Sequence, residues 1–179
     1  MSHDLISSSV SFDSSLSSSS SVLLVRDVAG DYRQVDADEV LQAAQQVLLG
    51  RVRGSDILGS PQAVRDYLRV RLGGLEHEVF AVLHLDVQNR VIDYVEMFRG
   101  TVSQTSVYPR EVVREAMVRN TYSIVMVHNH PSGSTQPSRA DEMLTQTLKT
   151  ALSLVDVRVL DHLIVGANNV LSMAEMGLI

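Results

Sequence analysis

Residues 123–141 read SIVMVHNHPSGSTQPSRAD and carry the most information in this chain. The stretch opens with a run of apolar, mostly β-branched residues, which predicts a buried strand. Because side chains alternate between the faces of a strand, His128 and His130 should point the same way at its end. Asp141 follows in the first turn of a predicted helix. Two histidines and a carboxylate, with one position left for water, are typical of a catalytic rather than a structural zinc site.

Ser138 and Asp141 also have a purely structural explanation. A serine three residues before an acidic residue, directly ahead of a helical pattern, is a capping box. A lone histidine is likewise more often a core or surface residue than a metal ligand. Because the histidine pair, the Pro-Ser-Gly turn after it and the acidic residue occur together, the pattern favours a metal site.

The composition limits the classes of protein to which the chain can belong. Its 179 residues are 45% hydrophobic and 20% charged, with a net charge of −6 and no cysteine. No apolar run approaches the roughly eighteen residues of a membrane span, and no secretory signal is evident. Without cysteine, disulfides and cysteine-ligated zinc sites such as those of nucleobase deaminases are excluded. We expect a cytoplasmic protein, and the acidic balance argues against autonomous DNA binding, which requires a basic face.

The sequence is expected to divide into three parts. Residues 1–21 are rich in serine and cannot bury enough apolar surface to order themselves, which predicts a disordered tail. Residues 22–56 should form a short extension, with a strand at 22–25 and a helix that ends at Gly50. Residues 57–179 should form one α/β domain around a single mixed sheet, because strands and helices alternate along it.

Apolar periodicity and turn residues predict the elements of this domain. Ser60 is expected to cap its first helix, with proline at the first helical position. The expected elements are helices at 61–72, 109–117 and 138–155 and strands at 79–85, 90–98, 124–127, 157–165 and 170–172.

Several motifs together closely resemble those of the RadC-type proteins, a bacterial branch of the JAB/MPN metalloprotease-like fold. They are H-x-H-P-S-G at 128–133, P-S-x-x-D at 137–141, FRGT at 98–101, VYPREV at 107–112 and LDHLIVG at 160–166. The resemblance covers residues 57–179 and implies a single MPN/JAB-like domain, with a mixed sheet flanked by helices in a cytidine-deaminase-like layout. Long RadC proteins also carry a helix-hairpin-helix segment. Residues 22–56 lack that pattern, so the chain is expected to be a short form.

The resemblance also implies roles for individual residues. His128, His130 and Asp141 match the zinc ligands of the family, which hold one ion per chain. Ser138 matches a serine that helps to stabilise the oxyanion in JAMM peptidases. Zinc in such a site activates a water molecule for attack on an amide carbonyl.

The general base of the family is a glutamate on an early strand. Glu78 and Glu96 are both candidates, and Glu78 is preferred because it opens its strand, as the family's glutamate does. His162, within LDHLIVG, is interpreted as a hydrogen-bonded structural histidine.

The implied activity is that of a zinc-dependent peptidase or isopeptidase acting on a protein or peptide. The alternative is a DNA-repair-associated or protein-interaction module without peptidase activity, although the complete set of ligand positions argues against it. A metal-dependent nuclease fits less well, because phosphodiester cleavage favours two metal ions. The natural substrate cannot be read from the sequence.

Overall fold

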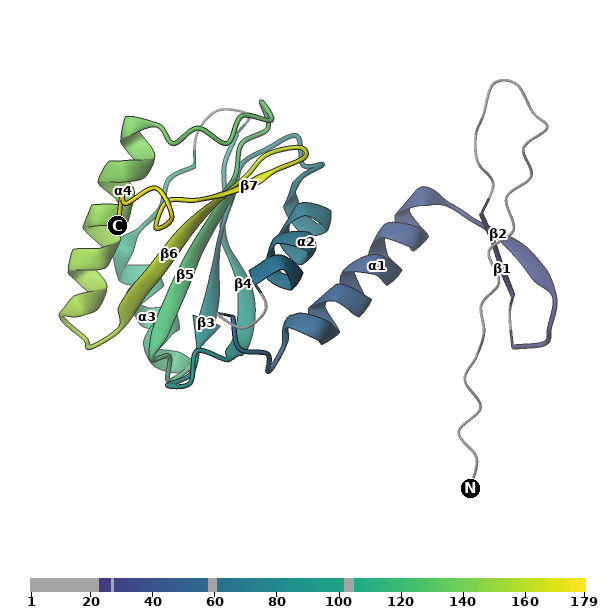
Figure 1. The fold of residues 1–179 in the computed structure, drawn as a ribbon, viewed down its shortest axis with the longest axis horizontal. Coiled ribbons are helices and arrows are strands. Elements are labelled where there is room, and N and C mark those ends of the chain that lie inside the picture. Colours follow the sequence, from purple (N-terminus) through teal and green to yellow (C-terminus); the bar gives the residue numbers. More distant parts are fainter. Residues whose placement is uncertain (1–22, 27, 58–60, 102–104) are drawn as a thin grey trace. The chain divides into compact units, whose positions relative to one another are not determined.

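The structure is a computed structural model that describes residues 23–26, 28–57, 61–101 and 105–179 (Figure 1). The tail expected at 1–21 and the expected cap Ser60 lie outside these residues. The chain divides into two compact units, Met1–Ala43 and Ala44–Ile179.

The described part of the first unit contains a hairpin. β1 (Leu23–Arg26) pairs antiparallel with β2 (Tyr32–Val35). The strand expected at 22–25 is observed from Leu23 onward. β2 was missed, because its side chains are exposed and its sequence, YRQV, has no apolar alternation to reveal it.

Helix α1 (Ala37–Val52) continues past Gly50, so the predicted end of this helix was wrong. Val52 is completely buried in the core. Burying a valine side chain contributes about 1.5–3 kcal/mol, whereas a glycine inside a helix costs about 1 kcal/mol relative to alanine. Packing of the last helical turn therefore outweighs the helix-breaking tendency of Gly50.

The second unit is built around a mixed five-stranded sheet with the order β4-β3-β5-β6-β7. Its strands are β3 (Val79–Leu85), β4 (Val91–Arg99), β5 (Ser123–Asn129), β6 (Arg158–Val165) and β7 (Val170–Ser172). β5 and β6 pair in parallel, and all other neighbours pair antiparallel. A parallel pair needs a crossover connection, which α4 (Arg139–Ser153) supplies.

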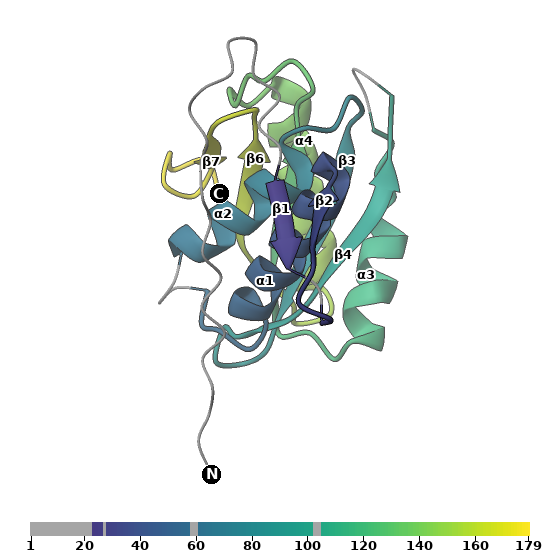
Figure 2. The ribbon, with the colours of Figure 1, turned by 90° about the vertical axis from the view of Figure 1, so that its right-hand side faces the viewer.

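Helices cover both faces of this sheet, as expected for the predicted α/β class (Figures 1 and 2). α2 (Pro61–Leu72) lies on one face, and α3 (Pro109–Val118) and α4 lie on the other. β3 and β5 are buried along their whole length, which explains their continuous apolar sequences. The predicted elements of the domain are all observed, with bounds that differ by a few residues at most.

Each face of β3 contributes to a separate half of the core. Ala81, Leu83 and Leu85 pack toward α2, whereas Phe80 and Val82 pack toward α3 and α4. This alternation matters for the candidate site, because it fixes which residues of β3 and of its neighbours share a face.

His84 is a titratable group buried within this sheet. Its Nδ1 lies 2.9 Å from the hydroxyl of Thr121, and its Nε2 has no hydrogen-bond partner among the described residues. Burial and, to a smaller extent, the charge of Arg119 lower the pKa of His84 to about 4, while the charge of Asp93 opposes this shift. The folded protein therefore keeps His84 neutral well below the pH at which an exposed histidine gains its proton.

We expect this histidine to make the fold less stable as the pH falls from about 6.5 to about 4. In that window the unfolded chain binds a proton at His84 and the folded chain does not, so protonation favours unfolding. A pKa lowered from 6.5 to about 4 corresponds to about 3 kcal/mol of stability. Urea unfolding of the wild-type chain and of His84→Leu should show a pH dependence smaller in the variant by about this amount. Equal pH dependence in both chains would contradict the assignment.

Candidate metal centre

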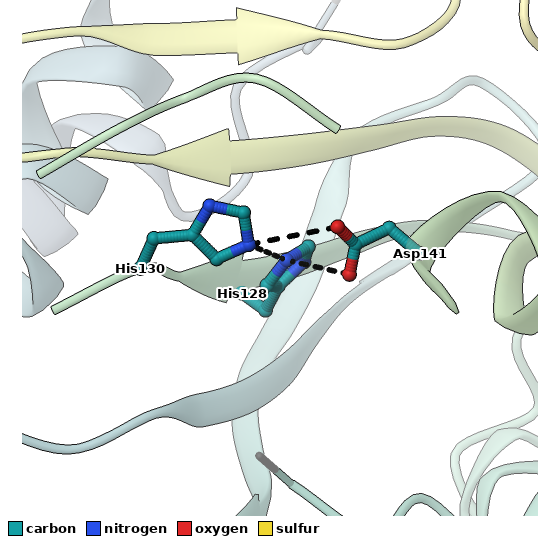
Figure 3. Close-up of side chains that lie close together, drawn as sticks. All are labelled: His128, His130 and Asp141. Carbon is teal, nitrogen blue, oxygen red and sulfur yellow. Dashed lines mark hydrogen bonds and ion pairs between the residues drawn. The ribbon is translucent and has the colours of Figure 1, made fainter. Parts of the chain in front are cut away.

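Three side chains that can bind a metal meet at the end of β5 (Figure 3). His128 is the next-to-last residue of β5, His130 directly follows the strand, and Asp141 lies in the first turn of α4. The Nε2 atoms of the two histidines are 2.8 Å apart. Asp141 Oδ1 lies 3.1 Å from His128 Nε2, and Asp141 Oδ2 lies 3.6 Å from His130 Nε2. The structure thus brings the three predicted ligands together.

The ligand atoms lie close enough together to surround one metal ion. In a tetrahedral zinc site, metal–ligand bonds of about 2.0–2.2 Å place neighbouring ligand atoms about 3.3–3.6 Å apart. Of the three separations here, that of 3.6 Å matches this range, whereas those of 2.8 and 3.1 Å are shorter, so the ligand atoms would move apart slightly to hold an ion. Two imidazoles and one carboxylate are also a donor set of catalytic zinc sites, which keep a further position open. The three residues therefore form a possible metal site.

The charges at the site favour a cation. Burial raises the pKa of the Asp141 carboxyl, but the neighbouring rings of His128 and His130 outweigh it and hold this pKa well below its usual range. The Asp141 carboxylate beside it raises the pKa of His130, although burial opposes the effect. The site therefore holds an anionic carboxylate beside two imidazole rings, and a proton or a metal ion can occupy the space between them.

The protonation of His130 is fixed by its other neighbour. Its Nδ1 lies 2.9 Å from the backbone carbonyl oxygen of Ser134, which can only accept a hydrogen bond. Nδ1 must therefore carry a proton. In the neutral ring, the lone pair of Nε2 then faces His128 and Asp141, as a metal ligand requires.

Asp141 has both of the roles that its sequence pattern allowed. Its Oδ2 accepts hydrogen bonds of 2.7 Å from the backbone N–H and from the hydroxyl of Ser138, and its own N–H donates to that hydroxyl. These contacts form the capping box at the start of α4. Oδ1 faces His128 instead. The cap therefore orients the carboxylate, and the role of Ser138 toward an oxyanion stays a prediction.

The loop after His130 is shaped by two glycines. Gly133 has a φ of +79°, which favours glycine, and its N–H donates to the carbonyl of His130 in a turn. Gly166, the last residue of LDHLIVG, lies so close to Gly133 that a Cβ at Gly166 would collide with the carbonyl oxygen of Gly133. The absence of side chains thus lets the loop lie against the end of β6.

Glu78 lies on the same face of the sheet as the histidines. Phe80 is paired directly with His128 across β3 and β5, so their side chains share a face. Glu78 precedes Phe80 by two residues, and alternation places it on that face too, opposite His130 if the antiparallel register continues. The negative charge of Glu78 contributes to the raised pKa of His130, which agrees with this position.

Glu96, the other candidate for the general base, lies elsewhere. It is paired with Ala81, whose side chain packs on the α2 face of the sheet. There its carboxylate forms an ion pair of 2.8 Å with Arg71 of α2. Of the two glutamates, only Glu78 is therefore placed near the predicted ligands.

Asn129, the residue between the two histidines, holds the segment that carries Glu78. Its Oδ1 accepts a hydrogen bond of 2.8 Å from the N–H of Val79, and its Nδ2 donates one of 3.0 Å to the carbonyl of His77. These are the peptide groups on either side of Glu78. The buried amide thus continues the contact between β3 and β5 beyond their last backbone pair, a role that sequence reasoning missed.

Comparison with known proteins agrees with this geometry. Residues 58–178 match the family model of the RadC-like JAB domain. The chain belongs to this family. The motifs at 128–133, 137–141 and 160–166 all lie within the matched RadC-like JAB domain.

Relatives of this RadC-like chain are named UPF0758 proteins. One from Leptothrix cholodnii is 54% identical over 150 residues, and one from Acidovorax sp. (strain JS42) is 56% identical over 150 residues. The aligned segments cover 84% of this chain in both cases, and 68% and 63% of the relatives. The chain therefore spans about two thirds of their length, and their names assign no activity.

The RadC-like JAB domain also contains two buried polar residues next to the site. His162 is hydrogen-bonded, as predicted, with its Nε2 2.8 Å from His128 Nδ1 and its Nδ1 2.6 Å from the hydroxyl of Thr145. Burial lowers the pKa of His162 well below its usual value. Thr145 was missed, although it lies one helical turn after Asp141 and therefore on the same side of α4.

Among the described residues, no helix combines the length and the apolar composition that crossing a bilayer requires.

Proposed function

We propose that the chain is a zinc-dependent peptidase or isopeptidase of the JAMM type that acts on a protein or peptide substrate. The observation that carries the proposal is the meeting of His128, His130 and Asp141 within 4.8 Å of one another. Glu78 on the same face of the sheet adds the carboxylate that amide hydrolysis needs as a general base.

The chemistry follows from these groups. Zinc held by His128, His130 and Asp141 would polarise an amide carbonyl and lower the pKa of water from about 15.7 toward about 7. Glu78 would accept the proton of the attacking water and deliver it to the leaving amine. Ser138, whose hydroxyl donates to Asp141 in this structure, would turn toward the carbonyl oxygen to stabilise its negative charge.

A protein or peptide fits this chain better than DNA as the substrate. The net charge is −6, whereas proteins that bind DNA through its phosphates present a basic face. A test of the proposal must therefore also detect DNA binding in the absence of peptide hydrolysis.

The test is metal-dependent hydrolysis by the purified full chain. The chain is stripped with EDTA, dialysed, and assayed on a pool of internally quenched peptides that includes peptides joined through a lysine side chain. We expect no hydrolysis after stripping, and recovery with about one equivalent of zinc per chain. The proposal would be overturned if the chain bound zinc but hydrolysed no peptide of the pool. It would also be overturned if hydrolysis persisted after EDTA treatment. Retention on DNA that weakens steeply with salt would instead favour the DNA-associated alternative.

A further inference from the structure

A chain of buried hydrogen bonds leads from one predicted ligand to the helix that carries another. His128 Nδ1 lies 2.8 Å from His162 Nε2. His162 Nδ1 lies 2.6 Å from Thr145 Oγ1, which lies 2.6 Å from the backbone carbonyl oxygen of Asp141. His162 and Thr145 are completely buried, so water does not compete for these bonds.

The direction of each hydrogen bond follows from its last acceptor. The carbonyl of Asp141 can only accept, so it takes the single hydroxyl proton of Thr145. Met173 Sδ, 3.8 Å from the same hydroxyl, is a much weaker acceptor. With its proton used, Thr145 can only accept from the ring of His162. His162 therefore carries its proton on Nδ1.

The same reasoning fixes the ring of His128. A neutral His162 with its proton on Nδ1 has a lone pair on Nε2, and this lone pair can only accept from His128 Nδ1–H. In the neutral ring, His128 then has its own lone pair on Nε2, the atom that faces His130 and Asp141. Three hydrogen bonds thus determine which nitrogen of His128 is free to bind a metal.

We propose that His162 and Thr145 are positioning residues for the metal site, which hold His128 with its Nε2 lone pair directed at the ion and couple it to Asp141. The proposal rests on the metal site of the proposed function and not on peptidase activity. His162 reaches His128 from β6, and Thr145 reaches the Asp141 peptide from within α4. The strand and the helix that supply ligands are therefore joined by side chains that do not touch the metal.

Packing supports the orientation of the His162 ring. Its edge lies against Phe80, with ring centroids 6.0 Å apart and planes at 74°. Because His162 and Thr145 are completely buried, water has little access to replace a bond lost at Thr145. Removing the Thr145 hydroxyl lets His162 place its proton on Nε2 instead. That proton would face His128 Nδ1–H, so His128 would have to move its own proton to Nε2 and lose its metal lone pair.

The test compares Thr145→Val with Thr145→Ser. Valine has the same shape but no hydroxyl, and serine restores the hydroxyl. The affinity for zinc is measured by competition with a chromophoric chelator. We expect about a 10–100-fold loss in Thr145→Val, the usual effect of removing a partner of a ligand, and near wild-type affinity in Thr145→Ser. Thr147→Val is the matched control, since Thr147 makes the same hydroxyl bond within α4, to Met143, but faces solvent.

A second measurement reads the ring protons directly. Long-range ¹H–¹⁵N spectra of the metal-free chain, labelled with ¹⁵N-histidine, distinguish the two neutral forms of each ring. We expect His162 to carry its proton on Nδ1 in the wild type and to change to the Nε2–H form in Thr145→Val. Unchanged zinc affinity in Thr145→Val with a lower unfolding temperature would overturn the proposal, because both residues would then only support the fold. A proton on Nε2 of His162 in the wild-type chain would overturn the proposal as well.

These outcomes are separate from those that test the proposed function. A chain that binds zinc but hydrolyses no peptide contradicts the peptidase activity, while the zinc affinities of the variants still decide the role of His162 and Thr145. A wild-type chain that binds no zinc overturns both proposals.

Discussion

Replacing His130 with alanine is expected to weaken zinc binding about a thousandfold. Binding of zinc by a complete set of protein ligands contributes roughly 10–16 kcal/mol, and losing one of three ligands removes on the order of 4 kcal/mol. His130 is the better choice for this test than His128. His128 is buried and bonded to His162, so its loss would also leave a buried partner unpaired, whereas the bond from His130 to Ser134 is exposed.

The measurement is zinc content by elemental analysis, after dialysis against a low concentration of zinc. The wild-type chain should retain about one zinc ion and His130→Ala almost none. His77→Ala is the matched control, because His77 lies near the site but outside the ligand cluster, with its ring beside Arg99. Zinc content that stays equal in wild type and His130→Ala would refute the site.

Replacing Glu78 with glutamine is expected to lower the rate of peptide hydrolysis by about 10²–10⁴-fold while zinc remains bound. General-base catalysis contributes a factor of this size. Glutamine has nearly the same shape as glutamate but cannot accept the proton of water. Asn129 holds the backbone on both sides of residue 78, and that contact does not involve the carboxylate, so the fold should be preserved.

Glu96→Gln provides the control for this experiment. Glu96 lies on the opposite face of the sheet, paired with Arg71, so its substitution should leave the rate within about twofold of wild type. Losing this partly exposed ion pair should cost only a small free energy of unfolding. Hydrolysis retained in Glu78→Gln and lost in Glu96→Gln would reverse the assignment of the base. Zinc lost from Glu78→Gln would show instead that Glu78 supports the ligand cluster.

Much of the site could be predicted because it depends on short-range geometry. Two histidines separated by one residue at the end of a strand must share a face, and a capping-box aspartate must lie at the start of its helix. These two local rules were enough to indicate that His128, His130 and Asp141 would converge. The buried strands were equally clear, since their apolar runs are continuous.

The remaining features depend on pairing between distant segments. The roles of Asn129 and Thr145 follow from the register of β3 on β5 and from the approach of α4 to β6, which no local pattern encodes. The preference for Glu78 over Glu96 rested on a family pattern, and only the pairing of the strands separates the two by face. The strand β2 was missed because its side chains are exposed. The end of α1 was misplaced because tertiary packing, which the local sequence does not encode, extends the helix.

The two oxygens of the Asp141 carboxylate have different partners, and this links metal binding to the order of the first turn of α4. Oδ2 completes the cap of α4 and Oδ1 faces His128, so an ion bound at the site also holds the first turn of the helix. By mass action, zinc at a hundred times its dissociation constant adds about 2.7 kcal/mol to the stability of the folded state. Much of that gain should protect the loop from His130 to Asp141 against local opening. Opening of this loop and release of the metal would then occur together, as one equilibrium.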